Sequence, residues 1–176
     1  SGSNKRCSTD VSISVPGKYY YAYRMVTGGV TSYSFGSDSW AENIETLSAT
    51  STLIVGEVSK ATGSWSSTGT WEDGTVPSGT ENVAIMHDVN VINTTATCAT
   101  IYIYNGSTLL IEDDGNLTTS GNITNDGNFT LESTSAGTGS IIARGTAIGN
   151  TSVQRYIAAW SDATHGWHFI SSPVAS

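Results

Sequence analysis

A run of three carboxylates, Glu112, Asp113 and Asp114, is the first feature of the sequence that could do chemistry. Calcium binds carboxylate and carbonyl oxygens, and adjacent acids at a turn can supply them. A calcium loop of the EF-hand type places its acids at alternate positions and adds a distal glutamate, which the segment IEDDGN does not. A solvated acidic turn is therefore the favoured interpretation. The three residues are kept as calcium candidates, and no other metal or cofactor site is predicted.

The histidines offer no recognisable catalytic set. His87 stands beside Asp88, while His165 and His168 follow Asp162. The nucleophile motif G-x-S-x-G is absent, and spacing alone cannot establish a Ser-His-Asp triad. A histidine near a strand end is usually structural. We therefore predict no catalytic residues and expect a non-enzymatic protein.

Four aromatic side chains could stack on sugar rings: Trp65, Trp71, Tyr102 and Tyr104. A carbohydrate-binding accessory module is thus one alternative function. A β-helical polysaccharide-cleaving enzyme is a weaker alternative, because such sites need clustered acidic or basic residues. Arg144 and Arg155 are the only basic residues after Lys60.

The elements that carry these residues follow a six-residue rhythm. Leu117, Ile123 and Phe129 stand six apart, and Gly115, Gly121 and Gly127 keep the same step. Two-residue hairpins would leave too little strand at this spacing. A β-solenoid fits, because three faces of about six residues make one coil of about eighteen to twenty. Ile141, eighteen residues after Ile123, is then expected to stack upon it.

Other inward positions follow from the same pattern. The expected inward residues of the earlier coils are Val83, Ile85, Val89, Val91, Ile101, Ile103, Leu109 and Ile111. The open end of a solenoid must be covered, since its first coil otherwise exposes apolar core and unpaired edges. Trp65 and Trp71 precede the first coil, so we expect both to be mostly buried there. Exposed, coplanar indoles would favour sugar stacking instead.

The first region alternates like ordinary strands. In PGKYYYAYR, the side chains of Tyr19, Tyr21 and Tyr23 fall on one strand face. This stretch resembles the sixth strand of an immunoglobulin-like sandwich, in which a glycine precedes by two residues the tyrosine of the tyrosine corner. Gly17, Tyr19 and Tyr21 occupy those places, with Tyr21 at the usual cysteine. Burial of the tyrosine row is favoured over a sugar platform.

Composition narrows the functional classes. The chain has 176 residues and a net charge of -8, and Lys5-Arg6 is its only adjacent basic pair. Nucleic-acid binding is therefore not expected. No apolar run approaches the roughly 20 residues of a membrane helix, so membrane insertion is not expected either. Cys7 and Cys98 could form a disulfide, or Cys98 could be a small core residue.

The stretch from residue 63 to 176 resembles a module of large secreted surface proteins of the Bacteroidota phylum. The entry WSSTGTWEDGTVPSGTENVAI, the body TCATIYIYNGSTLLIEDDGNLTTSGNITNDGNFTL, and the exit segments VQRYI and WHFISSPVAS carry the resemblance. The first region resembles the sandwich modules that often precede it. The resemblance implies export by the type IX secretion route and display or release at the cell surface. It supplies no catalytic residues.

These observations predict an all-β chain with two parts. Residues 1–58 are expected to be the C-terminal part of an immunoglobulin-like sandwich, 59–64 a linker, and 65–176 a short parallel β-helix (β-solenoid) that continues past the last residue. The predicted function is a structural or adhesive module of a secreted, cell-surface or filament-forming bacterial protein. Its expected partners are other domains of the same long polypeptide or neighbouring copies, with extracellular glycans as the further alternative.

Overall fold

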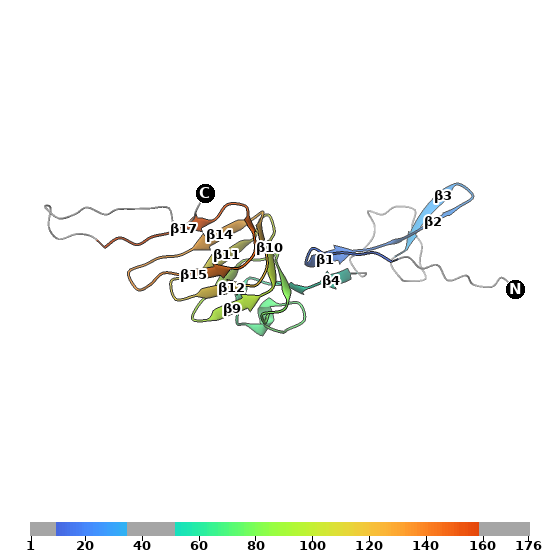
Figure 1. Cartoon of the computed structure of the whole chain (residues 1–176). Helices are drawn as coiled ribbons and strands as arrows, with labels where there is room; N and C mark the ends of the chain where they lie inside the picture. The colour runs from blue at the N-terminus through green and yellow to red at the C-terminus, as the bar shows by residue number, and fades with distance from the viewer. Residues whose placement is uncertain (1–9, 35–51, 159–176) are drawn as a thin grey trace.

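The computed structural model describes residues 10–34 and 52–158. Every regular element in these two ranges is a β-strand, apart from the short 3₁₀ helix η2 (Thr68–Thr70). The all-β prediction is therefore confirmed. Figure 1 shows a stack of short strands with a narrow ribbon projecting from one end.

Three parallel sheets form the stack. The β10 sheet contains, in order, β16 (Ala147–Ile148), β13 (Ile123–Asn125), β10 (Thr100–Ile103), β7 (Asn82–Ile85) and β5 (Glu57–Val58). The β11 sheet contains β17 (Ser152–Val153), β14 (Asn128–Leu131), β11 (Thr108–Ile111), β8 (Val89–Val91) and β6 (Gly63–Ser64). The β12 sheet contains β15 (Ser140–Ala143), β12 (Asn116–Thr119) and β9 (Thr95–Cys98). The chain visits the sheets in rotation, which makes a parallel β-solenoid of about three turns.

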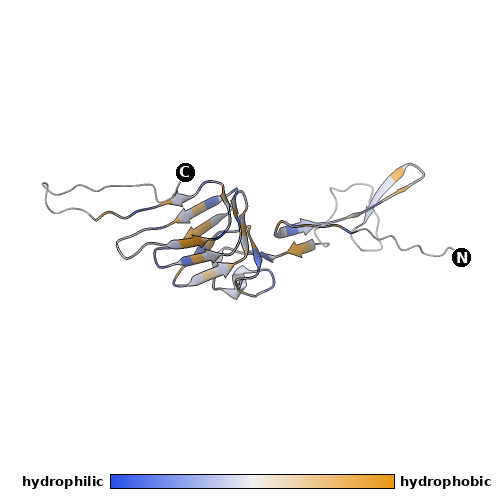
Figure 2. Cartoon of the chain, in the orientation of Figure 1, coloured by the Kyte–Doolittle hydropathy of each residue, from blue (hydrophilic) through white to orange (hydrophobic). Residues whose placement is uncertain are grey.

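The predicted inward residues form the core. Leu117, Ile123 and Phe129 come from three successive faces and are at most 4% exposed. The earlier inward positions are equally buried: Val83, Ile85, Val89, Val91, Ile101, Ile103, Leu109 and Ile111. Each such side chain contributes about 1.5–3 kcal/mol through removal from water. Figure 2 shows apolar segments repeating along the stacked strands. The predicted solenoid and its inward positions are confirmed.

The coil length is less regular than the sequence rhythm. Val83 pairs with Ile101, 18 residues later, whereas Leu117 pairs with Ile141, 24 residues later. The predicted stacking of Ile141 on Ile123 is therefore wrong. Ile141 pairs with Leu117 in the β12 sheet, whereas Ile123 pairs with Ile101 in the β10 sheet. The physical reason is the side loop between β14 and β15, which an antiparallel bridge closes between residues 133 and 138.

Glycines mark the corners because neighbouring coils approach closely there. A Cβ atom on Gly115 would lie 2.1 Å from the carbonyl oxygen of Val91, on the preceding coil. A Cβ atom on Gly127 would lie 2.3 Å from the carbonyl oxygen of Tyr104. Both distances are impossible for a real side chain, so the six-residue glycine step reflects backbone contact between coils.

Cys98 is a core residue of the solenoid. Its thiol is free and buried among the inward side chains. Burial raises the pKa of this thiol to about 12, so the thiolate needed for nucleophilic or redox chemistry is disfavoured. Cys7, the other cysteine of the possible disulfide, lies outside the described residues.

The expected linker, residues 59–64, belongs to the solenoid. Ser59 forms an antiparallel bridge with Trp71, and β6 pairs with β8. The strand before it, β5, pairs with β7. The solenoid therefore starts at Glu57, ahead of the boundary expected at Trp65.

Residues 10–34 and 52–55 form the projecting ribbon. β1 (Gly17–Tyr20) pairs with β4 (Thr52–Val55), and β2 (Tyr23–Thr27) pairs with β3 (Val30–Ser34), both antiparallel. Gly28 and Gly29, with φ of 60° and 84°, make the turn between β2 and β3. Within the described part of the chain, β1–β4 and β2–β3 are two separate two-stranded sheets, and no further strand pairs with either of them. The immunoglobulin-like sandwich is therefore not confirmed.

The tyrosine row is largely uncovered. The Tyr19 hydroxyl donates a hydrogen bond of 2.8 Å to the carbonyl of Val15, four residues upstream, as in a tyrosine corner. Tyr21 and Tyr23, however, are 46% and 57% exposed, and their rings contact each other edge-on at 6.0 Å. The expected burial of this row is thus not found among the described residues.

Candidate functional site

The tyrosines at the seam between ribbon and solenoid are structural contacts. Tyr102 lies on β10 and Tyr104 directly follows that strand. Both are half-buried, and their ring centroids are 4.6 Å apart. The Tyr104 hydroxyl donates a 3.0 Å hydrogen bond to the carbonyl of Pro16 in the ribbon, and burial raises its pKa to about 12. The Tyr102 hydroxyl donates to the carboxylate of Asp126. The hydroxyl groups of both candidate stacking tyrosines are therefore engaged within the chain.

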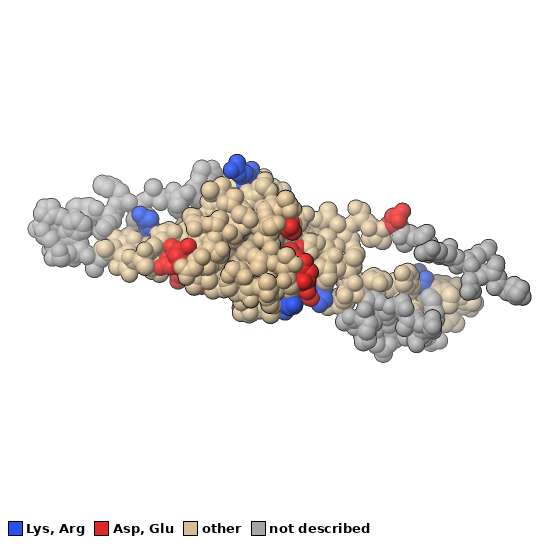
Figure 3. All heavy atoms as spheres, turned by 90° about the horizontal axis from the view of Figure 1, so that it is seen from below, with Lys and Arg blue, Asp and Glu red and all other residues tan. Residues whose placement is uncertain are grey.

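An ion pair reinforces the seam. The Lys18 ammonium lies 2.7 Å from the Glu72 carboxylate, and this hydrogen bond raises the pKa of Lys18. Figure 3 shows acidic and basic side chains next to each other where the solenoid meets the ribbon. The pair is partly exposed, so solvent screening keeps its contribution to stability small. Its main effect is to orient β1 against the solenoid.

The two tryptophans close the N-terminal end of the solenoid. Trp65 and Trp71 are 1% and 0% exposed, and their rings meet edge-on at 5.1 Å. The Trp71 indole N–H donates to the carbonyl of Trp65 at 2.9 Å, whereas the Trp65 indole N–H has no partner. Their expected burial is confirmed. Because stacking on a sugar needs an exposed ring face, neither indole is available for it in this structure.

The acidic turn does not converge on one point. Glu112 accepts a hydrogen bond from the Asn90 side chain at 2.5 Å. Asp114 accepts one from the backbone N–H of Asn93 at 2.8 Å, and Asp113 accepts one from the Thr134 hydroxyl. Each calcium candidate thus binds a different neighbouring segment. No group of three or more His, Cys, Asp or Glu side chains that could hold a metal ion occurs in residues 10–34 and 52–158.

His87 makes structural hydrogen bonds. Its Nδ1 lies 2.8 Å from the carbonyl oxygen of Ser59, and its backbone N–H donates to the Ser59 hydroxyl at 3.0 Å. These contacts anchor the end of β7 to the segment that follows β5. His165, His168 and Asp162 lie outside the described residues.

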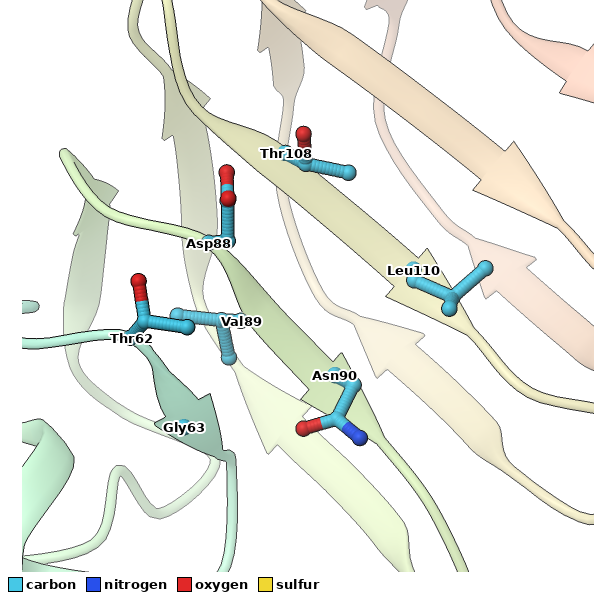
Figure 4. Close-up of a pocket in the computed structure, with 7 residues that line it drawn as sticks. All are labelled: Thr62, Gly63, Asp88, Val89, Asn90, Thr108 and Leu110. Atoms are coloured by element: carbon cyan, nitrogen blue, oxygen red, sulfur yellow. The ribbon is translucent and has the colours of Figure 1, made fainter.

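A shallow groove of about 270 Å³ crosses the outer side of the β11 sheet. Its lining residues are Thr62, Gly63, Asp88, Val89, Asn90, Thr108 and Leu110. Figure 4 shows the side chains of Thr62, Asp88 and Thr108 pointing to the same side of the sheet. A carboxylate between two hydroxyls can hydrogen-bond a polar ligand such as a sugar. The groove has no aromatic platform.

Glu57 is a buried acid of the described structure with an unpartnered carboxyl oxygen. It heads the inward column of the β10 sheet, where the register pairs it with Val83. The residue is only 7% exposed, and its Oε1 atom has no hydrogen-bond partner. Burial, and then the neighbouring Asp73 carboxylate, raise the pKa of Glu57 to about 7. Such an environment holds the carboxyl neutral below neutral pH.

Comparison with protein-family models, curated proteins and solved structures finds no match. Among the residues that the structure describes, none belongs to a helix long and apolar enough to cross a membrane.

Sequence reasoning missed the groove and Glu57 for different reasons. The groove joins Thr62, Asp88 and Thr108, which come together only through the register of β6, β8 and β11. Because the coils differ in length, no fixed period in the sequence indicates this column. Glu57 lies in a stretch without clear periodicity, GEVSKATGS, whose strand character comes from pairing with β7.

Proposed function

We propose that this chain is a non-catalytic structural or adhesive module of a secreted, cell-surface or filament-forming bacterial protein. In this proposal the solenoid is a stiff body and the ribbon is a joint that enters a larger sheet. In this proposal the covering strands come from another domain of the same polypeptide or from a neighbouring copy. The resemblance to Bacteroidota surface proteins supports the placement outside the cell.

The exposed apolar surface of the ribbon carries the proposal. Tyr23, Met25 and Val30 are 57%, 42% and 50% exposed and lie on one face of the β2–β3 ribbon. A two-stranded ribbon is marginally stable in water by itself. Contiguous exposed apolar surface commonly marks an interaction site. A facing sheet would bury these side chains and stabilise the ribbon at the same time.

The solenoid supports the role of a stiff body. Its inward columns run without interruption through successive coils, from Val83 through Ile101 to Ile123 and from Val89 through Leu109 to Phe129. Side chains also bridge the coils on the outside, as in the Thr100 hydroxyl bond to Asn82 at 2.8 Å. Each coil is therefore fixed to its neighbours by backbone, core and surface contacts.

The first experiment measures association of the full chain. Light scattering over a range of concentrations, combined with hydrogen exchange of residues 23–34, is expected to show association that protects the ribbon amides. Replacement of Tyr23 and Met25, which share one face of the ribbon, by serine should weaken that association. The matched control is serine at Ile148, which is 62% exposed on the solenoid. A monomer whose ribbon amides are already protected would contradict the joint.

The carbohydrate alternative is tested separately. With Trp65 and Trp71 buried, a glycan would bind in the groove at Asp88, an exposed carboxylate that lines it together with Thr62 and Thr108. Binding on a glycan array that is lost in Asp88→Asn and kept in Asp114→Asn would favour this alternative. Release of reducing ends from acidic polysaccharides would contradict the non-catalytic assignment.

A further inference from the structure

The ribbon consists of two strand pairs with different surroundings. The ribbon base is β1 with β4, and the ribbon tip is β2 with β3. Tyr21 and Ala22 link β1 to β2 outside any strand. Figure 1 shows the base next to the solenoid and the tip beyond it. Because an isolated pair of strands is only marginally stable in water, each pair needs further contacts.

The base meets the solenoid at the start of β1. Pro16 and Gly17 are buried there. The Tyr104 hydroxyl, at the corner after β10, donates a hydrogen bond of 3.0 Å to the carbonyl of Pro16. A Cβ atom on Gly17 would lie 2.5 Å from the same hydroxyl oxygen. An alanine at this position would therefore displace the hydroxyl and break its hydrogen bond to Pro16.

Two further contacts hold the base from other segments of the solenoid. Gly56, directly after β4, has φ of 73°, and a Cβ atom there would lie 2.3 Å from the carbonyl oxygen of Asn82 on β7. Glycine alone permits both this conformation and this close approach. On β1, the Lys18 ammonium lies 2.7 Å from the Glu72 carboxylate. The base is thus held by the corner after β10, by β7 and by the segment that follows η2.

The tip is far more exposed than the base. All five residues of β2 are exposed, from Tyr23 to Thr27. The ring of Tyr23 contacts that of Tyr21, at 6.0 Å, so this aromatic contact stays within the ribbon. The solenoid therefore supplies the contacts that the base needs, while the apolar face of the tip remains available.

We infer that the base is part of the solenoid body, and that Tyr104 is the positioning residue that fixes the direction in which the tip leaves it. The movable part of the ribbon then begins at Tyr21. This inference rests on the proposed joint, because a fixed base lowers the ordering cost when a partner binds the tip. It also gives Gly17 a reason that needs no sandwich, since this glycine leaves room for the Tyr104 hydroxyl.

The fixed base is tested by distances between spin labels in dilute full chain. Cys7 is replaced by serine, and the buried Cys98 thiol stays unlabelled. One label is attached to a cysteine at Asn128, which is exposed on β14. The other is attached at Thr52 in the base or at Thr27 in the tip, both exposed. We expect a narrow distance distribution for the base and a broad one for the tip. A base distribution as broad as that of the tip would overturn the inference.

The contact between Gly17 and Tyr104 is tested by a double-mutant cycle. Gly17→Ala and Tyr104→Phe should each broaden the base distribution several-fold, because each removes the hydrogen bond to Pro16. The double variant should be no broader than Gly17→Ala alone, since the hydroxyl is already gone and the nearest ring carbon would lie 3.4 Å from the new methyl group. Circular dichroism checks that the solenoid stays folded. Additive broadening in the double variant would contradict the contact.

A matched control is the neighbouring tyrosine. The Tyr102 hydroxyl donates to Asp126, which belongs to the solenoid and not to the base. Tyr102→Phe makes the same chemical change as Tyr104→Phe and should leave both distance distributions unchanged. Equal broadening of the base by the two variants would assign the effect to the tyrosine pair as a whole, and would contradict the positioning role of Tyr104.

Association of the chain separates this inference from the proposed function. Tyr104→Phe leaves the apolar face of the tip intact, so light scattering should show weaker association while the urea midpoint of the solenoid stays close to that of the wild type. A residue that only stabilised the solenoid would change the midpoint instead. A fixed base in a wild type that does not associate would refute the joint and leave the base assignment standing. Unchanged association in Tyr104→Phe with a broadened base would overturn the positioning role.

Discussion

The ribbon and the solenoid have similar sequence patterns, but their apolar side chains differ in burial. Both alternate apolar and polar side chains along short strands. In the solenoid, each inward residue meets the next coil and is removed from water, as Leu109 is at 0% exposure. In the ribbon, Val26 remains 54% exposed, because no further sheet among the described residues covers it. Alternation therefore defines a face, while stacking supplies what the face packs against.

The difference also explains why the two parts differ in self-sufficiency. A solenoid creates its own partner by repetition, so each added coil buries the apolar residues of the one before. A two-stranded ribbon has no further coil to pack against, so it is only marginally stable in water by itself. The same chemical change placed in both environments, or on two sides of one strand, tests this contrast.

The largest effect is expected at the inward face of β11. Leu109→Asp places an unpaired charge in the core and should unfold the solenoid, at a cost of several kcal/mol. Leu110→Asp makes the same change one residue later, on the outward side. It should leave the urea midpoint nearly unchanged by circular dichroism. Equal midpoints for the two variants would refute the inward and outward assignment.

A pH effect of at most about 3 kcal/mol is expected from Glu57, whose pKa is raised from 4.5 to about 7. Between these values the folded state binds more protons than the unfolded state, so stability falls as pH rises and levels off above about 7. Urea unfolding near pH 5 and near pH 8 should show this loss in the wild type. A Glu57→Gln variant with the same loss would place the titration elsewhere.

The next effect is expected at the corner glycines, where an added methyl group should lower the free energy of unfolding by about 1–3 kcal/mol. In Gly115→Ala, the new methyl group would meet the Val91 carbonyl oxygen at 2.1 Å, which forces the coils apart. In Gly79→Ala, the nearest atoms belong to Thr97 at 3.9 Å, so the same change is accommodated. Thermal unfolding should separate the two variants. If both are tolerated, close coil contact does not explain the glycine step.

These glycines show how far the sequence could predict the fold. The six-residue step around Gly115 and Gly127 indicated a solenoid and its inward residues, because one strand pattern is repeated with little interruption. The partner of Ile141 was mispredicted, since the loop at residues 132–139 adds length without disturbing the local pattern. At the candidate site, Trp65 and Trp71 were placed correctly by their position before the first coil. Glu57 has no such local signal.

A smaller effect on stability is expected from the indole nitrogens of Trp65 and Trp71. Trp71→Phe and Trp65→Phe remove the same ring volume. The first also removes a hydrogen bond to the Trp65 carbonyl, whereas the second removes a buried N–H that has no partner. Trp71→Phe should therefore be less stable than Trp65→Phe by about 1–3 kcal/mol. The reverse order of stability in urea unfolding would contradict the hydrogen-bond arrangement of Trp65 and Trp71.

The smallest effect is expected in the ribbon. Val→Thr keeps the shape of the side chain and adds a hydroxyl, so it tests burial without creating a cavity. At Val91, which is 0% exposed on β8, the hydroxyl has no solvent and should cost about 1–3 kcal/mol. At Val30, which is 50% exposed on β3, the hydroxyl meets water, and the free energy of unfolding measured with urea should change by less than about 0.5 kcal/mol. The size of the Val30 effect then reports whether the ribbon face that also carries Tyr23 and Met25 is covered. It should stay near zero in dilute monomer and rise toward the Val91 value wherever a facing sheet is bound. A large Val30 cost in the monomer would mean that the ribbon is already packed, and the joint would lose its basis.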